Sequence, residues 1–257
     1  MKTAETLFDW QSYSPADDCL KEKIILVTGA AEGIGKAVSI AAAKHGATVI
    51  LLDKKTRHLE KVYDQIVEQG STEPVMLPFD LLQCTPQAID VILDGIMQDF
   101  GRLDGLLHNA AELGSPSPLD QYDLEYWQKV MLVNLQAPYI LTRGLLPALK
   151  SSEQAQLLFT SAKCGRSPSA YWGAYGIAYG GLESQMKIWA DELENPSNII
   201  VNSIDPGPVR TAFRRRSHPG ESQDSLITPQ TITKAYLKIF SGDHDYFATQ
   251  LSIQEQG

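Results

Sequence analysis

From Ile24 onward, short apolar runs alternate with longer stretches of helical periodicity. Strands buried on both faces read as continuous apolar runs, and a helix must carry the chain from each strand to its parallel neighbour. The runs predict strands at 24–28, 48–53, 74–80, 103–109, 156–161, 199–204 and 246–252. Helices are predicted near 34–45, 56–70, 86–100, 123–149, 174–194 and 229–241. This pattern is typical of an α/β fold, a doubly wound parallel sheet with helices on both faces.

The size of the chain favours one domain. Its 257 residues, 43% of them hydrophobic, suit one large core better than two small ones. We expect a single domain over 1–257, in which 1–22 form an N-terminal extension. This extension and the polar stretch 214–225 are predicted to be the least structured parts.

The charge balance limits the classes of partner. A formal net charge of -9 argues against nucleic acid or an anionic membrane, because both bind basic surfaces. The cysteines Cys19, Cys84 and Cys164 lack CxxC spacing and predict reduced thiols without a metal site. No apolar run approaches the roughly 18 residues of a membrane span, and the start lacks a signal sequence. We therefore expect a cytoplasmic protein.

A glycine-rich turn follows the first predicted strand, in the stretch IILVTGAAEGIGKAV. Gly29, Gly33 and Gly35 would let backbone amides and a helix N-terminus approach a pyrophosphate. Asp53 ends the second predicted strand, 18 residues after Gly35, as in dinucleotide-binding folds. A nucleotide triphosphatase loop is excluded, because five residues separate Gly29 from Gly35 and Ala37 follows the lysine.

The acidic side chains near this turn favour NAD over NADP. Asp53 would accept hydrogen bonds from the adenosine ribose and repel a 2′-phosphate, and Glu32 adds a second negative charge. Lys54 and Lys55 argue the other way, although they also suit the exposed start of a helix.

Three motifs together carry a family resemblance. The spacing TGxxxGIG over 28–35, HNAA at 108–111 and NSIDPGPVRT at 202–211 resembles the short-chain dehydrogenase/reductase family. The resemblance implies a Rossmann-like domain with seven parallel strands in the order 3-2-1-4-5-6-7. It also implies a homodimer or homotetramer, and it makes 211–228 the loop that closes over the substrate.

The resemblance assigns cofactor contacts along the chain. Asp80 and Leu81 would adjoin the adenine, and Asn109 would form a wall with Ala110. The full set of expected cofactor-binding residues is Gly29, Glu32, Gly33, Ile34, Gly35, Asp53, Asp80, Leu81, Asn109, Ala110, Tyr175, Tyr179, Pro206, Gly207, Val209 and Thr211. Asn109 could instead cap a strand, DPGP could be a rigid turn without a ligand, and His108 is expected to be a packed strand residue.

Two of the four catalytic positions of the family are substituted. The resemblance makes Tyr175 the proton-transfer residue and Asn134 the holder of a relay water. Ala162 stands where the family has serine, and Tyr179 stands where it has lysine. Strand alternation would direct the neighbours of Ala162, Ser161 and Lys163, to the opposite face. Without a cation, Tyr175 is expected to titrate near its ordinary pKa of about 10.

These observations leave two functions open. One is an NAD(H)-dependent oxidoreductase, weakened or altered, that interconverts a carbonyl compound and a secondary alcohol. The other is a non-catalytic dinucleotide-binding protein, either a sensor or a subunit beside an active relative. The arginines at 210 and 214–216 suit an anionic substrate, but a solvated basic loop is the interpretation that we favour.

Overall fold

The computed structural model describes residues 5–194 and 198–254. Its strands are β1 (Glu5–Leu7), β2 (Ile24–Thr28), β3 (Thr48–Asp53), β4 (Val75–Pro78), β5 (Gly105–His108), β6 (Ala155–Thr160), β7 (Ile199–Asp205) and β8 (Gln250–Ser252). Its α-helices are α1 (Gly33–Lys44), α2 (Thr56–Glu68), α3 (Pro86–Asp99), α4 (Leu124–Met131), α5 (Ala137–Lys150), α6 (Lys163–Arg166), α7 (Gly173–Leu193), α8 (Ala212–Ser217) and α9 (Thr233–Ser241). Short helical turns are η1 (Leu81–Gln83), η2 (Leu119–Gln121), η3 (Leu132–Gln136) and η4 (Gln223–Ser225).

The strands form one sheet in the order β1-β8-β7-β6-β5-β2-β3-β4, and every pair is parallel. The predicted order of the seven strands from Ile24 onward is found, but the predicted number of strands is wrong. An eighth strand, β1, pairs with β8 at the edge.

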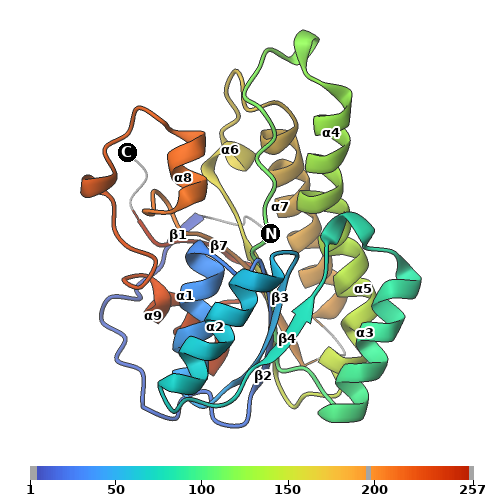
Figure 1. Ribbon diagram of the computed structural model, residues 1–257, viewed down its shortest axis with the longest axis vertical. Coiled ribbons are helices and arrows are strands. Elements are labelled where there is room, and N and C mark those ends of the chain that lie inside the picture. Colours follow the sequence, from blue (N-terminus) through green and yellow to red (C-terminus); the bar gives the residue numbers. More distant parts are fainter. Residues whose placement is uncertain (1–4, 195–197, 255–257) are drawn as a thin grey trace.

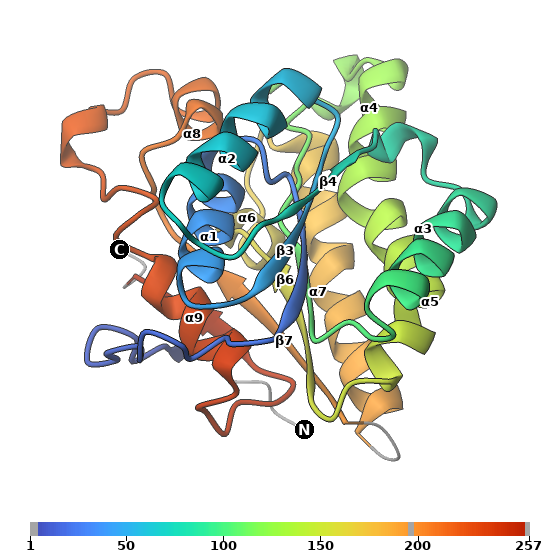
Figure 2. The ribbon, with the colours of Figure 1, turned by 60° about the horizontal axis from the view of Figure 1, so that its bottom comes forward.

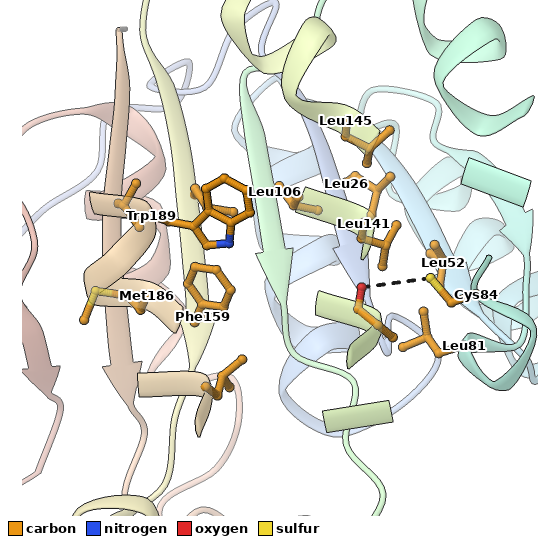
Figure 3. Packing of buried hydrophobic residues seen from close by; sticks show 14 of the residues in the cluster. Leu26, Leu52, Leu81, Cys84, Leu106, Leu141, Leu145, Phe159, Met186 and Trp189 are labelled. Atoms are coloured by element: carbon orange, nitrogen blue, oxygen red, sulfur yellow. Dashed lines mark hydrogen bonds between the residues drawn. The ribbon is translucent and has the colours of Figure 1, made fainter. Parts of the chain in front are cut away.

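Helices cover both faces of the sheet, as Figures 1 and 2 show. The helices α1, α2 and α9 pack on one face, and α3, α5 and α7 on the other. In Figure 3, Leu26, Leu106 and Phe159 of neighbouring strands meet apolar side chains of the helices on the second face. The sheet is therefore packed between two apolar layers, one on each face. Polar residues lie at the ends of its strands.

Both segments expected to be least structured consist largely of loops and turns, and the described part of the first one packs against the domain. Residues 1–4 of that expectation lie outside the described residues. Phe8, Trp10 and Leu20 are buried, and the Trp10 indole donates a hydrogen bond to the Ile253 carbonyl at 2.9 Å. The stretch 214–225 continues α8 and contains η4. Buried apolar residues therefore attach the first segment to the domain, although it has little regular secondary structure.

The long helix predicted over 123–149 is divided by η3, which has π-helical hydrogen bonds. Such turns add one residue to a helix and often occur at functional sites. Asn134 lies in this turn.

No helix among the described residues has the length and apolar character needed to cross a membrane.

Candidate active site

A cavity of about 1070 Å³ lies at the carboxyl ends of the central strands. Open parallel sheets bind their ligands at this edge. The cavity is lined by all the expected site residues except Gly35 and Asn134, namely Gly29, Glu32, Gly33, Ile34, Asp53, Asp80, Leu81, Asn109, Ala110, Ala162, Tyr175, Tyr179, Pro206, Gly207, Val209 and Thr211. Residues separated by more than a hundred positions in sequence therefore share one wall.

The three glycines of the turn are required by backbone conformation or by close packing. Gly29 and Gly33 have φ values of 69° and 55°, which non-glycine residues rarely adopt. A Cβ atom at Gly35 would lie 2.2 Å from the Gly29 carbonyl oxygen, so Gly35 is needed for packing behind the cavity wall. Because α1 begins at Gly33, its free amide groups lie at the cavity. This glycine cradle and helix end fit the pyrophosphate of a dinucleotide.

A threonine joins the glycine turn to the end of β5. The Thr28 hydroxyl accepts hydrogen bonds from the amides of Asn109 and Ala110, at 2.9 and 3.0 Å. The Asn109 side chain donates to the Thr28 carbonyl at 3.2 Å. Asn109 therefore fixes the backbone of the wall, as a strand-end cap would, while it also lines the cavity.

Acidic and basic groups meet at the end of β3. The Asp53 carboxylate accepts hydrogen bonds from the amides of Ala31 and Lys55, at 3.2 and 2.9 Å. Glu32 pairs with the Lys55 ammonium at 2.7 Å, and this hydrogen bond lowers the pKa of Glu32. The His58 imidazole lies 3.6 Å from Glu32. Two carboxylates and two basic side chains thus lie near the end of β3, where the sequence predicts the adenosine ribose.

The expected proton-transfer residue is deeply buried. Tyr175 and Tyr179 lie one turn apart on α7, are 5% and 4% exposed, and have ring centroids 4.5 Å apart. Burial, followed by the neighbouring Tyr179, raises the pKa of Tyr175 well above 10. Burial also raises the pKa of Tyr179. The expectation that Tyr175 titrates near 10 is therefore wrong, because it neglected loss of solvation, and both phenols are neutral at neutral pH.

The residues on both sides of Ala162 line the cavity with it. The expectation that Ser161 and Lys163 lie on the opposite face is therefore wrong. The reason is that the chain has already left β6 and turned into α6. The Ser161 hydroxyl does not take the role of the missing serine here, because it donates its hydrogen bond to Glu183.

The Asn134 side chain is hydrogen-bonded to the backbone of the cavity wall. Its side chain exchanges two hydrogen bonds of 2.8 Å with the amide and carbonyl of Glu112. Glu112 lines the cavity, whereas Asn134 lies behind it. The predicted relay water on Asn134 stays a prediction.

Several residues of this site were not predicted from the sequence. Trp172 and Phe213 line the cavity, with ring centroids 5.6 and 5.7 Å from that of Tyr175. Glu183 lies two turns after Tyr175 on the same face of α7, so helical spacing could have identified it. Arg166, which pairs with Glu183 and Asp205, had no such signal.

Two arginines of the predicted basic loop have acidic neighbours. Arg214 binds Glu221 through two hydrogen bonds of 2.6 and 2.7 Å, and Arg210 lies 3.9 Å from Asp224. Arg214 and Arg216 line the cavity.

No group of three potential metal ligands occurs within residues 5–194 and 198–254.

The chain is similar to several known proteins in sequence and in fold. The family model described as short chain dehydrogenase matches residues 23–222. The oxidoreductase YciK of Escherichia coli strain K12 is 40% identical over 231 residues, which cover 90% of this chain and 91% of that protein. The structure of a short chain dehydrogenase from Pseudomonas syringae has a TM-score of 0.92 and 41% identity, covering 97% of this chain and 100% of that one. A short chain dehydrogenase from Escherichia coli CFT073, complexed with NADPH, has a TM-score of 0.90 and 38% identity, covering 94% and 100%.

Proposed function

The chain belongs to the short-chain dehydrogenase/reductase family, and on this premise we propose that it interconverts a carbonyl compound and a secondary alcohol with a nicotinamide dinucleotide. One observation carries the proposal: the glycine cradle and Tyr175 line the same cavity. A bound nicotinamide ring would supply or accept the hydride. The chain itself would bind the pyrophosphate at α1, orient the substrate and transfer a proton.

Tyr175 is the proposed proton donor. A neutral phenol is in the correct form to protonate the oxygen of a carbonyl compound as it is reduced. The reverse reaction needs the phenolate, which burial disfavours. We therefore propose that the protein favours reduction over alcohol oxidation. The loop 211–228, which contributes Phe213 to the cavity, would cover the substrate.

NAD(H) is the cofactor that we propose for this chain. The Asp53 carboxylate would bind the ribose hydroxyls and oppose a 2′-phosphate. The NADPH bound to the similar protein from Escherichia coli CFT073 favours NADP(H) instead. Lys54 and Arg216 on the cavity wall would offer positive charge to its 2′-phosphate. Binding measurements with both reduced cofactors would distinguish the two.

The experiment that tests the reaction is a single turnover of bound NADH or NADPH with a panel of aldehydes, ketones and dicarbonyl compounds. We expect oxidation of the cofactor in the wild-type protein, its loss in Tyr175→Phe, and its retention in the matched variant Tyr179→Phe. Loss only in Tyr179→Phe would transfer the proton-donor role to that residue.

A non-catalytic dinucleotide-binding protein is the second candidate function. It is favoured by the replacement of two catalytic residues by Ala162 and Tyr179. Tight binding of cofactor without hydride transfer to any compound of the panel would support this alternative.

A further inference from the structure

A buried charge cluster lies beside the catalytic half of the cavity. Arg166 of α6 donates hydrogen bonds to Glu183 of α7, at 3.2 Å, and to Asp205 at the end of β7. The Arg166 side chain is 14% exposed, and the side chains of both acids are 5% exposed. A single guanidinium thus joins three segments that are distant in sequence.

The two carboxylates hold further polar groups. Glu183 accepts hydrogen bonds from Ser161, from Ser203 at 2.9 Å and from the Gln250 amide. These partners lie directly after β6 and on β7 and β8. Buried carboxylates are costly unless hydrogen bonds and an opposite charge compensate them. The planar guanidinium suits this position, because its donors can reach two carboxylates at once, which a lysine ammonium does less well.

Asp205 connects this cluster to the cavity wall. Its other carboxylate oxygen accepts a hydrogen bond from the Gly207 amide at 2.9 Å. Gly207 has a φ of 66°, and the turn is held from its other side by Gln254, whose amide donates to the carbonyls of Pro206 and Pro208 at 2.7 and 3.1 Å. The turn therefore has two supports, of which one depends on Asp205.

The other end of the arginine belongs to a second segment of the wall. Arg166 ends the helix α6, whose residues Lys163 and Cys164 line the cavity directly after Ala162. Tyr175 lies two turns before Glu183 on α7. The positions of α6, the 205–208 turn and the proposed proton donor are thus linked through one side chain.

The resemblance implies that Pro206, Gly207, Val209 and Thr211 hold the nicotinamide end of the cofactor, and all four line the cavity. We propose that Arg166 is a positioning residue that fixes the 205–208 turn against α6 and α7 and so shapes the half of the cavity that receives the nicotinamide ring. This inference rests on the proposed function, because it requires a nicotinamide dinucleotide in the cavity. Arg166 does not line the cavity itself, so its effect is transmitted through Asp205. The adenosine half, formed by Asp53 and the glycine turn, lies outside the cluster.

Two ligands distinguish positioning from general stability. The first ligand is whichever of NADH and NADPH binds more tightly. The second is the corresponding fragment that lacks the nicotinamide ring, which is ADP-ribose for NADH and its 2′-phosphate for NADPH. In Arg166→Lys we expect the dissociation constant of the complete cofactor to rise about tenfold, as loss of one charge-assisted hydrogen bond predicts. The dissociation constant of the fragment should change less than about twofold. In steady-state assays, KM for the cofactor should rise more than kcat falls.

Arg102 provides the matched control. Its guanidinium pairs with the buried Asp104 at 3.1 Å, but next to the amino end of β5, away from the cavity. Arg102→Lys should lower the melting temperature and leave both dissociation constants unchanged. Should Arg166→Lys fail to fold, Asp205→Asn keeps an oxygen for the Gly207 amide, removes the charge that binds Arg166, and is expected to show the same selective loss.

The outcomes separate the two proposals. Equal loss of affinity for the cofactor and its fragment, or no loss for either, would overturn the role of Arg166. Failure of the wild-type protein to bind either compound would instead remove the proposed function. A selective loss in Arg166→Lys with no such loss in Arg102→Lys would support the inference.

Discussion

The phenol rings of Tyr175 and Tyr179 lie against each other with their centroids 4.5 Å apart and their planes at 35°. The resemblance of the sequence to its family places a lysine at the second position, so an aromatic ring occupies the space of a cation. The contact is favourable for packing, because aromatic pairs stabilise each other at such distances. It gives no electrostatic support to a phenolate, and burial of both hydroxyls makes ionisation harder.

Restoration of the family residues tests this explanation. The double variant Ala162→Ser, Tyr179→Lys should accelerate alcohol oxidation about a hundredfold or more, because it supplies a hydrogen bond to the reacting oxygen and a cation that lowers the pKa of Tyr175. Reduction should gain less, since it uses the neutral phenol. Initial rates in both directions measure the effect, and the single variants are its controls. No gain in either direction would contradict our account of the defect.

The cofactor preference should depend on Asp53. Asp53→Asn removes one negative charge but keeps an oxygen for the amide of Ala31 or Lys55. We expect the affinity for NADPH to rise about tenfold relative to NADH, as removal of repulsion from a 2′-phosphate predicts. Fluorescence titration with both reduced cofactors measures the ratio. Asp80→Asn, at the expected adenine position, is the control and should leave the ratio unchanged.

The sheet could be predicted because its strands are short apolar runs that need no knowledge of their neighbours. β1 was missed because Glu5–Leu7 forms a strand only against β8, nearly the whole chain away. The cavity wall followed from the rule that ligands lie after the carboxyl ends of parallel strands. The Arg166 cluster could not be found in this way, since its members become neighbours only in the folded protein. Likewise, the sequence gives no measure of burial, so the pKa of Tyr175 was misjudged.

A buried histidine should make the stability depend on pH. His108 was expected to be a packed strand residue, and this prediction is confirmed: it is 4% exposed, stacks on Phe159 and lies 2.8 Å from the Thr142 hydroxyl. Burial lowers its pKa from 6.5 to about 3. Between these values the unfolded chain binds a proton that the folded chain excludes, so acidification below pH 6.5 favours unfolding by up to about 1.4 kcal/mol per pH unit.

Urea unfolding of the wild-type protein and His108→Asn at pH 7 and pH 5 measures this contribution. Carboxylates titrate in both proteins, so the difference between them isolates the histidine. We expect the wild-type protein to lose about 1 to 2 kcal/mol more than the variant on acidification, within the slope given above. Parallel losses in the two proteins would show that His108 is not buried in its neutral form.

Exposed apolar side chains on α5 and α7 predict self-association. Tyr139 is 45% exposed and Ile188 57% exposed, and Tyr139 stacks on Trp189 of α7 with ring centroids 6.2 Å apart. Large exposed apolar patches are typical of subunit interfaces, and these side chains would contribute to one. We expect a dimer or tetramer by size-exclusion chromatography with light scattering, and a smaller species for Ile188→Glu. Val91→Glu, on the exposed face of α3, should leave the mass unchanged.

The N-terminal segment should contribute to global stability although it is expected to be among the least structured parts of the chain. Trp10 is buried, its indole donates to the Ile253 carbonyl, and β1 pairs with β8 just before it. Truncation of a buried tryptophan to alanine leaves a cavity and an unpaired carbonyl, so Trp10→Ala should lower the free energy of unfolding by about 3 kcal/mol. Leu7→Ala, at an exposed position of the same segment, should cost less than about 1 kcal/mol. Equal small effects in urea denaturation would mean that the segment detaches before the sheet unfolds. A large effect of Trp10→Ala alone would instead show that β1 and the segment after it unfold together with the sheet.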